Sequence, residues 1–152
     1  MKTKISILFI TILIGLMTSC NETVDELNLV EFTQIGQDNL YGNGQENITK
    51  QNLVISESNS WNELIDKINT VYDVSSGFTE TDIDFTNFMV IAIFDNIKPN
   101  GGHSIDIMKV LENKNQITIT IKNVLKGDAT TVMTQPFQIV KISKSDKLII
   151  FE

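Results

Sequence analysis

The sequence predicts an α+β fold, a mainly antiparallel β sandwich or barrel-like sheet with one packed helix. Two observations support this class. Apolar and polar residues alternate through most of the second half, which is typical of half-buried strands. One segment, residues 60–71, instead places apolar residues at spacings of three and four, which is typical of a helix with one buried stripe. The 152 residues are enough for one compact domain.

The N-terminus predicts a secretory signal that ends before a modified cysteine. Lys2 and Lys4 precede an apolar run at 5–17, too short to span a bilayer, and two small residues then lead to Cys20. Residues 16–20 resemble a lipobox, which implies lipidation of Cys20. The alternative is an ordinary secreted protein with a free thiol. A lipid anchor accounts better for a lone cysteine, since unpaired cysteines are a liability in oxidising compartments.

Three segments follow from this interpretation. Residues 1–19 are a lipoprotein signal peptide, residues 20–28 an acidic tether, and residues 29–152 a single α+β domain. Within the domain, residues 29–35 predict a first strand and residues 36–44, rich in turn formers, a mobile loop.

A second strand begins at residues 53–55, and the predicted helix follows it. Ser60 and Glu63 have the spacing of a capping box, so the helix should begin at Ser60. The residues of its apolar stripe are Trp61, Leu64, Ile65, Ile68 and Val71. A polar bridge at 73–84 then leads to the strands of the second half.

Five strands are predicted after the bridge. Residues 88–94 form a continuous apolar run and should be a central strand. Residues 103–110 and 116–122 alternate and predict a hairpin. Residues 137–142 and 147–151 complete a second strand pair.

The composition is acidic, which excludes several classes of partner. The chain has 12 basic and 19 acidic residues and a formal charge of −7. Removing Lys2 and Lys4 with the signal leaves 10 − 19 = −9. Such a surface repels phosphates, so we expect no nucleic-acid binding, and membrane contact through the lipid anchor only.

The sequence offers little for catalysis or metal binding. His103 is the only histidine, and no nucleophile motif accompanies it. Residues 80–86 begin like a calcium-binding loop, but Asn87 replaces the turn glycine and Ile93 the bidentate glutamate. We therefore expect a non-enzyme with no cofactor and no metal.

Two motifs carry a family resemblance. Residues 99–107 contain a glycine pair that opens a strand, and residues 133–142 contain a Thr-x-Pro-aromatic segment that leads into the closing one. In this order they resemble the C-terminal domain of PrcB-type protease-complex lipoproteins, over residues 88–151. His103 stands where that family usually has tyrosine, and residues 123–131 replace a proline-rich stretch. The resemblance implies a secreted or surface protease as partner.

The motif residues also have a physical interpretation of their own. Pro99 restricts the backbone, and Gly101 and Gly102 free it for a tight turn or a close approach. Pro136 favours an extended Gln135 and a rigid start to the next strand. One interpretation is that these residues only fix turns.

The functional interpretation is that residues 98–104 and 126–136 form one contact surface, with Phe137 in the core. The candidate partner-binding residues are Gly101, Gly102, His103, Gln135 and Pro136. The sequence thus predicts a lipid-anchored, non-catalytic protein of the bacterial cell envelope, periplasmic or surface-exposed, which binds or stabilises a partner protein. The alternative is a small β-rich protease inhibitor that uses the loop at 98–104.

Overall fold

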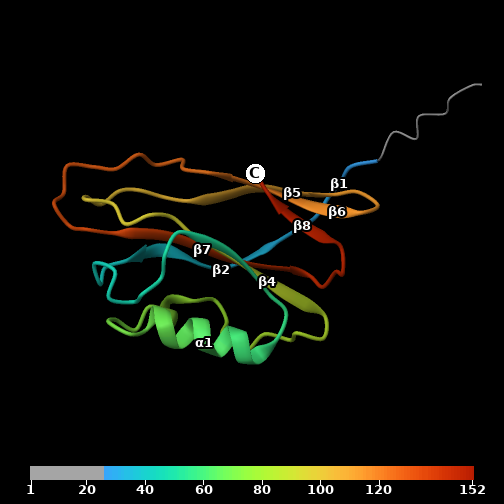
Figure 1. The fold of residues 1–152 in the computed structure, drawn as a ribbon, viewed down its shortest axis with the longest axis horizontal. Helices are drawn as coiled ribbons and strands as arrows, with labels where there is room; N and C mark the ends of the chain where they lie inside the picture. The colour runs from blue at the N-terminus through green and yellow to red at the C-terminus, as the bar shows by residue number, and fades with distance from the viewer. Residues whose placement is uncertain (1–25) are drawn as a thin grey trace, which may run out of the picture.

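The computed structural model describes residues 26–152. In this part of the chain two four-stranded sheets lie face to face, and one α-helix covers the outer face of one of them (Figure 1). The elements are β1 (Asn28–Leu29), β2 (Thr33–Leu40), β3 (Gln51–Ile55), α1 (Ser58–Ile68), β4 (Phe88–Phe94), β5 (Asp106–Glu112), β6 (Gln116–Lys122), β7 (Gln135–Ser143) and β8 (Leu148–Phe151). The predicted α+β, sandwich-like class is confirmed, and the two sheets do not close into a barrel.

The central sheet has the order β2-β7-β4-β3 and lies between the helix and the other sheet. β4 is apolar on both faces because each face meets a different core. One set of alternate residues packs under α1: Val90, Ala92 and Phe94. The other set packs between the sheets: Met89, Ile91 and Ile93. The prediction of a central strand at 88–94 is confirmed.

The outer sheet has the order β1-β5-β6-β8. β5 and β6 form the predicted hairpin. The predicted pairing of 137–142 with 147–151 is wrong, since β8 pairs in parallel with β6. Both edges of β7 are already occupied, by β2 and by β4, so the chain crosses to the outer sheet after Ser143.

A buried glutamine joins the two sheets. The pairing of β5 with β6 is irregular between Ile107 and Lys109, and the Ile107 N–H donates to Gln138 Oε1 on β7. Gln138 Nε2 donates to Gln34 Oε1 at 3.0 Å. The side chain of Gln138 therefore satisfies a backbone donor that the other sheet leaves free.

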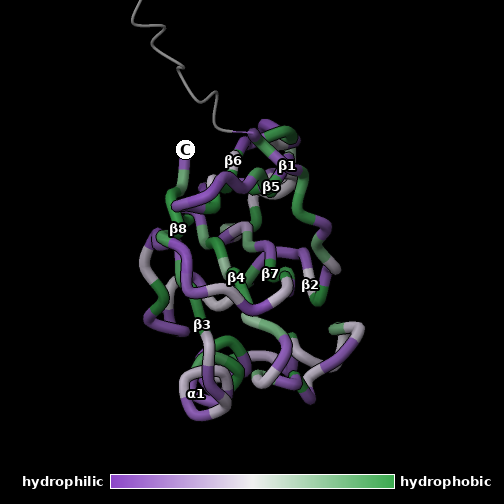
Figure 2. The backbone as a smooth tube through the Cα atoms, turned by 90° about the vertical axis from the view of Figure 1, so that its right-hand side faces the viewer, coloured by the Kyte–Doolittle hydropathy of each residue, from purple (hydrophilic) through white to green (hydrophobic). Residues whose placement is uncertain are grey.

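Helix α1 begins two residues earlier than predicted. Ser60 Oγ donates to Glu57 Oε1 at 3.2 Å, and the N-cap residue Glu57 makes no side-chain cap bond, so the predicted capping box with Glu63 is not formed. The apolar stripe is confirmed within the helix, where Trp61, Leu64 and Ile68 are buried and Ile65 packs beside them. Its last predicted member, Val71, lies beyond the end of α1 at Ile68. Figure 2 shows the hydrophobic side of α1 turned toward the central sheet.

The N-terminal part of the domain differs most from the prediction. The predicted strand at 29–35 is divided between β1 and β2, and β2 continues to Leu40 through much of the predicted loop at 36–44. β2 bulges between Gln34 and Gly36. An added Cβ at Gly36 would lie 2.5 Å from the Phe78 ring, so the glycine allows that ring to pack on the strand.

The predicted signal peptide at 1–19 and Cys20 lie outside the described residues, as does most of the tether at 20–28. Within residues 26–152, no helix has the length and apolar character needed to cross a membrane.

Candidate functional site

The two segments singled out from the sequence, 98–104 and 126–136, lie side by side and are called here the loop pair. Lys98 N donates to Thr134 O at 2.7 Å, and Thr134 N returns a bond to Lys98 O at 3.1 Å. Gly127 N donates to Gly102 O at 3.0 Å. The loop pair lies at the left end of the sandwich in Figure 1, opposite the end where the described chain begins. The structure therefore brings the predicted contact surface together.

Side chains reinforce this contact between the segments. Thr130 Oγ1 accepts from Gly101 N at 2.9 Å, and Asn100 Nδ2 donates to Asp128 O at 2.6 Å. Asp128 Oδ1 accepts from both the N–H and the hydroxyl of Thr130. These bonds from Thr130 hold the pKa of Asp128 below its ordinary value, with a smaller contribution from His103.

Glycines set how closely the segments approach. Gly102 has φ +69°, and an added Cβ there would lie 2.7 Å from Asp128 Oδ2. Gly127 has φ +103°, and its Cβ would lie 2.5 Å from His103 Nε2. Gly101 is buried. These glycines therefore allow the two segments to lie close together, as predicted from the sequence for Gly101 and Gly102.

His103 and Ser104 do not form a nucleophile and base pair. His103 Nε2 lies 3.0 Å from Asn100 Oδ1, and Ser104 Oγ donates to Asp106 Oδ2. His103, Ser104 and Asp106 line a shallow surface pocket of about 390 Å³ together with Leu125. The hydrogen bonds of both side chains hold the loop in shape.

Gln135 and Pro136, the last two residues of the loop pair, are buried. Gln135 is 2 % exposed, and its Nε2 donates to Ile48 O and to Asp95 O, each at 2.9 Å. Pro136 O accepts from Asp95 N at 3.0 Å. Of the five candidate residues, Gly102 and His103 thus reach the surface, whereas Gly101, Gln135 and Pro136 support it from below.

Asp95, which sequence reasoning missed, anchors the base of the loop pair. Its carboxylate is 2 % exposed and lies 2.7 Å from Lys98 Nζ and 3.4 Å from Lys50 Nζ. Asn123 Nδ2 donates to Asp95 Oδ2 at 2.8 Å and to Ser104 O at 2.9 Å. Burial raises the pKa of Asp95, but hydrogen bonds and charge from the lysines outweigh it and leave the pKa below its ordinary value. The sequence does contain one feature that could have identified Asp95, since it is an acidic residue directly after the wholly apolar strand β4.

Large apolar side chains are exposed on the loop pair and on its flanks. Large side chains that are 38–57 % exposed are Ile97, Val124, Leu125, Val132 and Met133. Of the five, Val132 and Met133 belong to the loop pair, and Ile97, Val124 and Leu125 flank it. Single exposed apolar side chains are ordinary, whereas several on neighbouring segments are typical of contact surfaces between proteins.

The calcium-like segment at 80–86 leads without regular structure into a turn at residues 85–87. Asp84 accepts from Thr86 N at 2.9 Å and from Asn87 Nδ2 at 2.8 Å, and these bonds hold its pKa below the ordinary value. In the described part of the chain, no three histidine, cysteine or acidic side chains gather as a metal site would need.

Comparison with protein families found one family model that matches the segment containing the loop pair. Residues 89–143 match the family described as PrcB C-terminal. This segment is therefore similar to the PrcB C-terminal family. The resemblance seen in the sequence is confirmed over residues 89–143, whereas residues 144–151, which it was predicted to include, lie outside the match. Comparisons with curated proteins and with solved structures found no match. The matched segment comprises nearly all of β4, then β5, β6 and β7, and therefore both members of the loop pair.

Proposed function

We propose that this protein is a lipid-anchored, non-catalytic protein of the bacterial cell envelope that binds and stabilises a partner protein. The partner class we propose is a secreted or surface protease, because the PrcB C-terminal match suggests association with a protease complex. Cys20 carries the lipid anchor, and the anchor alone contacts the membrane, on the periplasmic or the outer side.

The observation that carries the proposal is the loop pair. It joins segments about thirty residues apart through backbone bonds in both directions between Lys98 and Thr134, within the segment that matches the PrcB C-terminal family. The loop pair and its flank also present half-exposed apolar side chains, of which Leu125, on the flank, is 57 % and Val132 51 % exposed. A pre-formed surface loses little conformational entropy when a partner binds.

The inhibitor alternative needs the loop at 98–104 to enter a protease cleft. The buried Gly101 donates its N–H to Thr130 Oγ1, and its carbonyl accepts from Asp128 N at 2.9 Å. The segment at 126–136 thus occupies the backbone groups that a substrate-like loop would offer to a protease. This arrangement favours broad surface contact over insertion.

The test uses the full-length lipoprotein, solubilised in detergent with its native envelope fraction. A double variant, Leu125→Ser with Val132→Ser, removes apolar area from the loop pair and its flank. Leu148→Ser on β8, at a side chain that is 64 % exposed, is the matched control. We expect wild type and control to retain a protease, identified by mass spectrometry and by its activity, and the double variant to lose it.

Adding the purified lipoprotein to that protease then separates the two alternatives. A longer active lifetime at 37 °C supports stabilisation, whereas an immediate fall in activity supports inhibition. Equal retention of the protease by the double variant and the Leu148→Ser control would contradict the proposed surface.

A further inference from the structure

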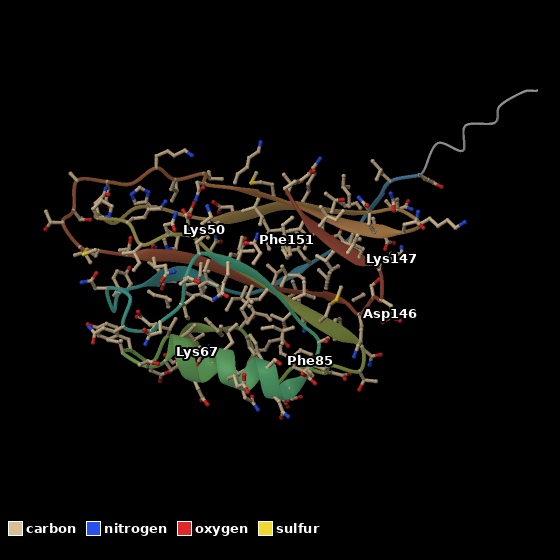
Figure 3. The ribbon with its side chains drawn as sticks, in the orientation of Figure 1. Lys50, Lys67, Phe85, Asp146, Lys147 and Phe151 are labelled. Atoms are coloured by element: carbon tan, nitrogen blue, oxygen red, sulfur yellow. The ribbon has the colours of Figure 1, made fainter. Side chains whose placement is uncertain are left out.

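The sandwich is open along one side, between the edges of its two sheets. β3 forms one edge of the central sheet and β8 one edge of the outer sheet, and Figure 2 shows both on the same side of the molecule. A surface pocket of about 240 Å³ lies between them. Lys50, directly before β3, and Phe151, on β8, line this pocket from its two sides and are labelled in Figure 3.

The pocket combines apolar side chains with polar ones, three of which already have partners. Its apolar residues are Ile105, Ile121 and Phe151, and its polar residues are Lys50, Asn52, Asn123 and Glu152. Asn123 Nδ2 donates to Asp95 Oδ2, and Lys50 Nζ lies 3.4 Å from Asp95 Oδ1. Glu152 Oε1 accepts from the Thr120 hydroxyl. Specific recognition here must therefore come mainly from the main chain of the adjoining strands.

The free edge of β3 presents main-chain groups that point away from the sheet. Asp95 N donates to Pro136 O, so the odd-numbered residues of β4 bond to β7 and the even-numbered ones bond to β3. Their partners are the odd-numbered residues of β3. Asn52 and Val54 therefore direct their N–H and C=O groups outward, where an added strand would meet them.

The other strand edges are shorter or obstructed. β1 has two residues and β8 four, whereas β3 has five in continuous register with β4. β2 bulges between Gln34 and Gly36, and Thr79 N donates to Ile35 O at 2.9 Å, so another segment of the chain already bonds to β2. β3 has neither a bulge nor a proline, two features by which edges resist pairing. Its free edge is thus a template for a strand from another chain.

We propose that the partner protein adds an extended segment to β3 as a further antiparallel strand of the central sheet. The inference rests on the proposed function in that the segment belongs to that partner. Antiparallel addition continues a sheet whose neighbouring strands are all antiparallel. Asn52 and Val54 pair with Ile93 and Ile91, which face the outer sheet, so the residues opposite them in the added strand face it too. These residues are apolar, because Val54 is 42 % exposed and Phe151 lines the pocket on that side.

The charge and position of this edge favour a partner over a second copy of the chain. The formal charge of −7 opposes association of two copies, whereas a neutral or basic segment is not repelled. The described chain begins next to β1, at the opposite edge of the outer sheet from β8. Lys50 contacts Asp95 at the base of the loop pair, so one partner can contact both surfaces.

The test is a titration of the isotope-labelled full-length protein in detergent with a short synthetic peptide, followed by NMR. The probe has the sequence Lys-Val-Thr-Val-Thr-Val-Lys with blocked ends and N-methylated threonines, so the N–H groups of its valines remain available to β3. In the control peptide two of the valines are N-methylated instead. We expect saturable shifts and slower hydrogen exchange at the amides of Asn52 and Val54. Affinity for the control peptide should be at least about tenfold weaker, because two main-chain bonds are lost.

Two substitutions at one position separate the main chain of β3 from its side chain. Val54→Pro removes an N–H that points away from β4 and leaves the bonds between β3 and β4 in place. It should therefore fold and bind the probe at least about tenfold more weakly. Val54→Thr keeps the N–H and should bind the probe within about threefold of wild type.

Three results of these titrations would overturn the inference: equal affinity for the two peptides, an absence of saturable shifts, or wild-type affinity in a folded Val54→Pro. Protection at Ile149 and Phe151 in place of Asn52 and Val54 would also overturn it, as would protection that rises with protein concentration alone, which would indicate a second copy. The comparison of the two peptides needs no variant, so it decides the matter even if Val54→Pro does not fold. The titration requires no partner, so its failure is distinct from failure of the capture experiment.

Discussion

Replacing Asp95 by alanine should destabilise the whole domain, although the residue lies at the edge of the candidate surface. The substitution removes a carboxylate that is 2 % exposed and leaves two ammonium groups without their partner. It also removes one of the two acceptors of Asn123 Nδ2. Breaking a buried ion pair from one side costs about 3–5 kcal/mol.

The exposure of the lysines reduces this magnitude. The Lys98 side chain is 25 % exposed and the Lys50 side chain 58 %, so both recover part of their hydration when Asp95 is lost. We therefore expect Asp95→Ala to lower the free energy of unfolding by about 2–3 kcal/mol. Lys98→Met, which removes the closer and more buried partner of Asp95, should lower the free energy of unfolding by less than Asp95→Ala does. Lys50→Met should lower it by about 0–1 kcal/mol.

Urea unfolding followed by circular dichroism at pH 7 measures these three values. Asp95→Ala should lower the free energy of unfolding most and Lys50→Met least. A loss below about 1 kcal/mol for Asp95→Ala, or equal losses for the two lysine variants, would refute the assignment of Asp95 as the anchor of this network.

The same network has a pH dependence with a defined sign. The pKa of Asp95 lies below its ordinary value in the folded protein. Its contribution is therefore fully present above the unfolded pKa of about 3.9 and is lost as the pH falls through the folded pKa. The stability difference between wild type and Asp95→Asn should be constant from pH 7 to 5 and shrink below about pH 4. A difference that grows on acidification would contradict this sign.

Two further substitutions test the contacts that position the site. Gln138→Leu leaves the buried N–H of Ile107 without an acceptor, so the free energy of unfolding should fall by about 1–3 kcal/mol. Hydrogen exchange at the Ile107 amide should also become faster, and an unchanged exchange rate would contradict the contact. Gly102→Ala forces a Cβ into the left-handed region and against Asp128, and should cost about 1–2 kcal/mol by urea unfolding. Gly77→Ala, where an added Cβ meets nothing within 4 Å, is its control and should change stability little.

The elements that sequence reasoning identified correctly are those whose pattern follows from burial alone. β4 is apolar throughout because both of its faces meet a core, and the β5–β6 hairpin alternates because one face meets solvent. Alternation identifies a strand but does not identify its partner. The parallel pairing of β8 with β6 depends on the occupied edges of β7, which no local pattern reveals.

The same distinction applies to the candidate site. Proximity of the two loops was inferred from their motifs, and Thr134, which donates to Asn100 O, belongs to one of them, whereas Thr130, which accepts from Gly101 N, has no distinctive local pattern. The burial of Gln135 follows from its pairing with Leu40 and from the carbonyls of Ile48 and Asp95. These three contacts of Gln135 are made to residues at least forty positions away along the chain.

The burial of the motif residues decides which substitutions can report on function. Gly101 and Pro136 support the fold through their backbone bonds to Asp128 and Asp95, so a variant at either position changes folding and binding together. Exposed side chains of the same surface, such as Leu125 and Val132, make binding separable from folding. A loss of partner capture in a fully folded variant at those two positions therefore assigns the surface, whereas the same loss in a Gly101 variant would follow from either role.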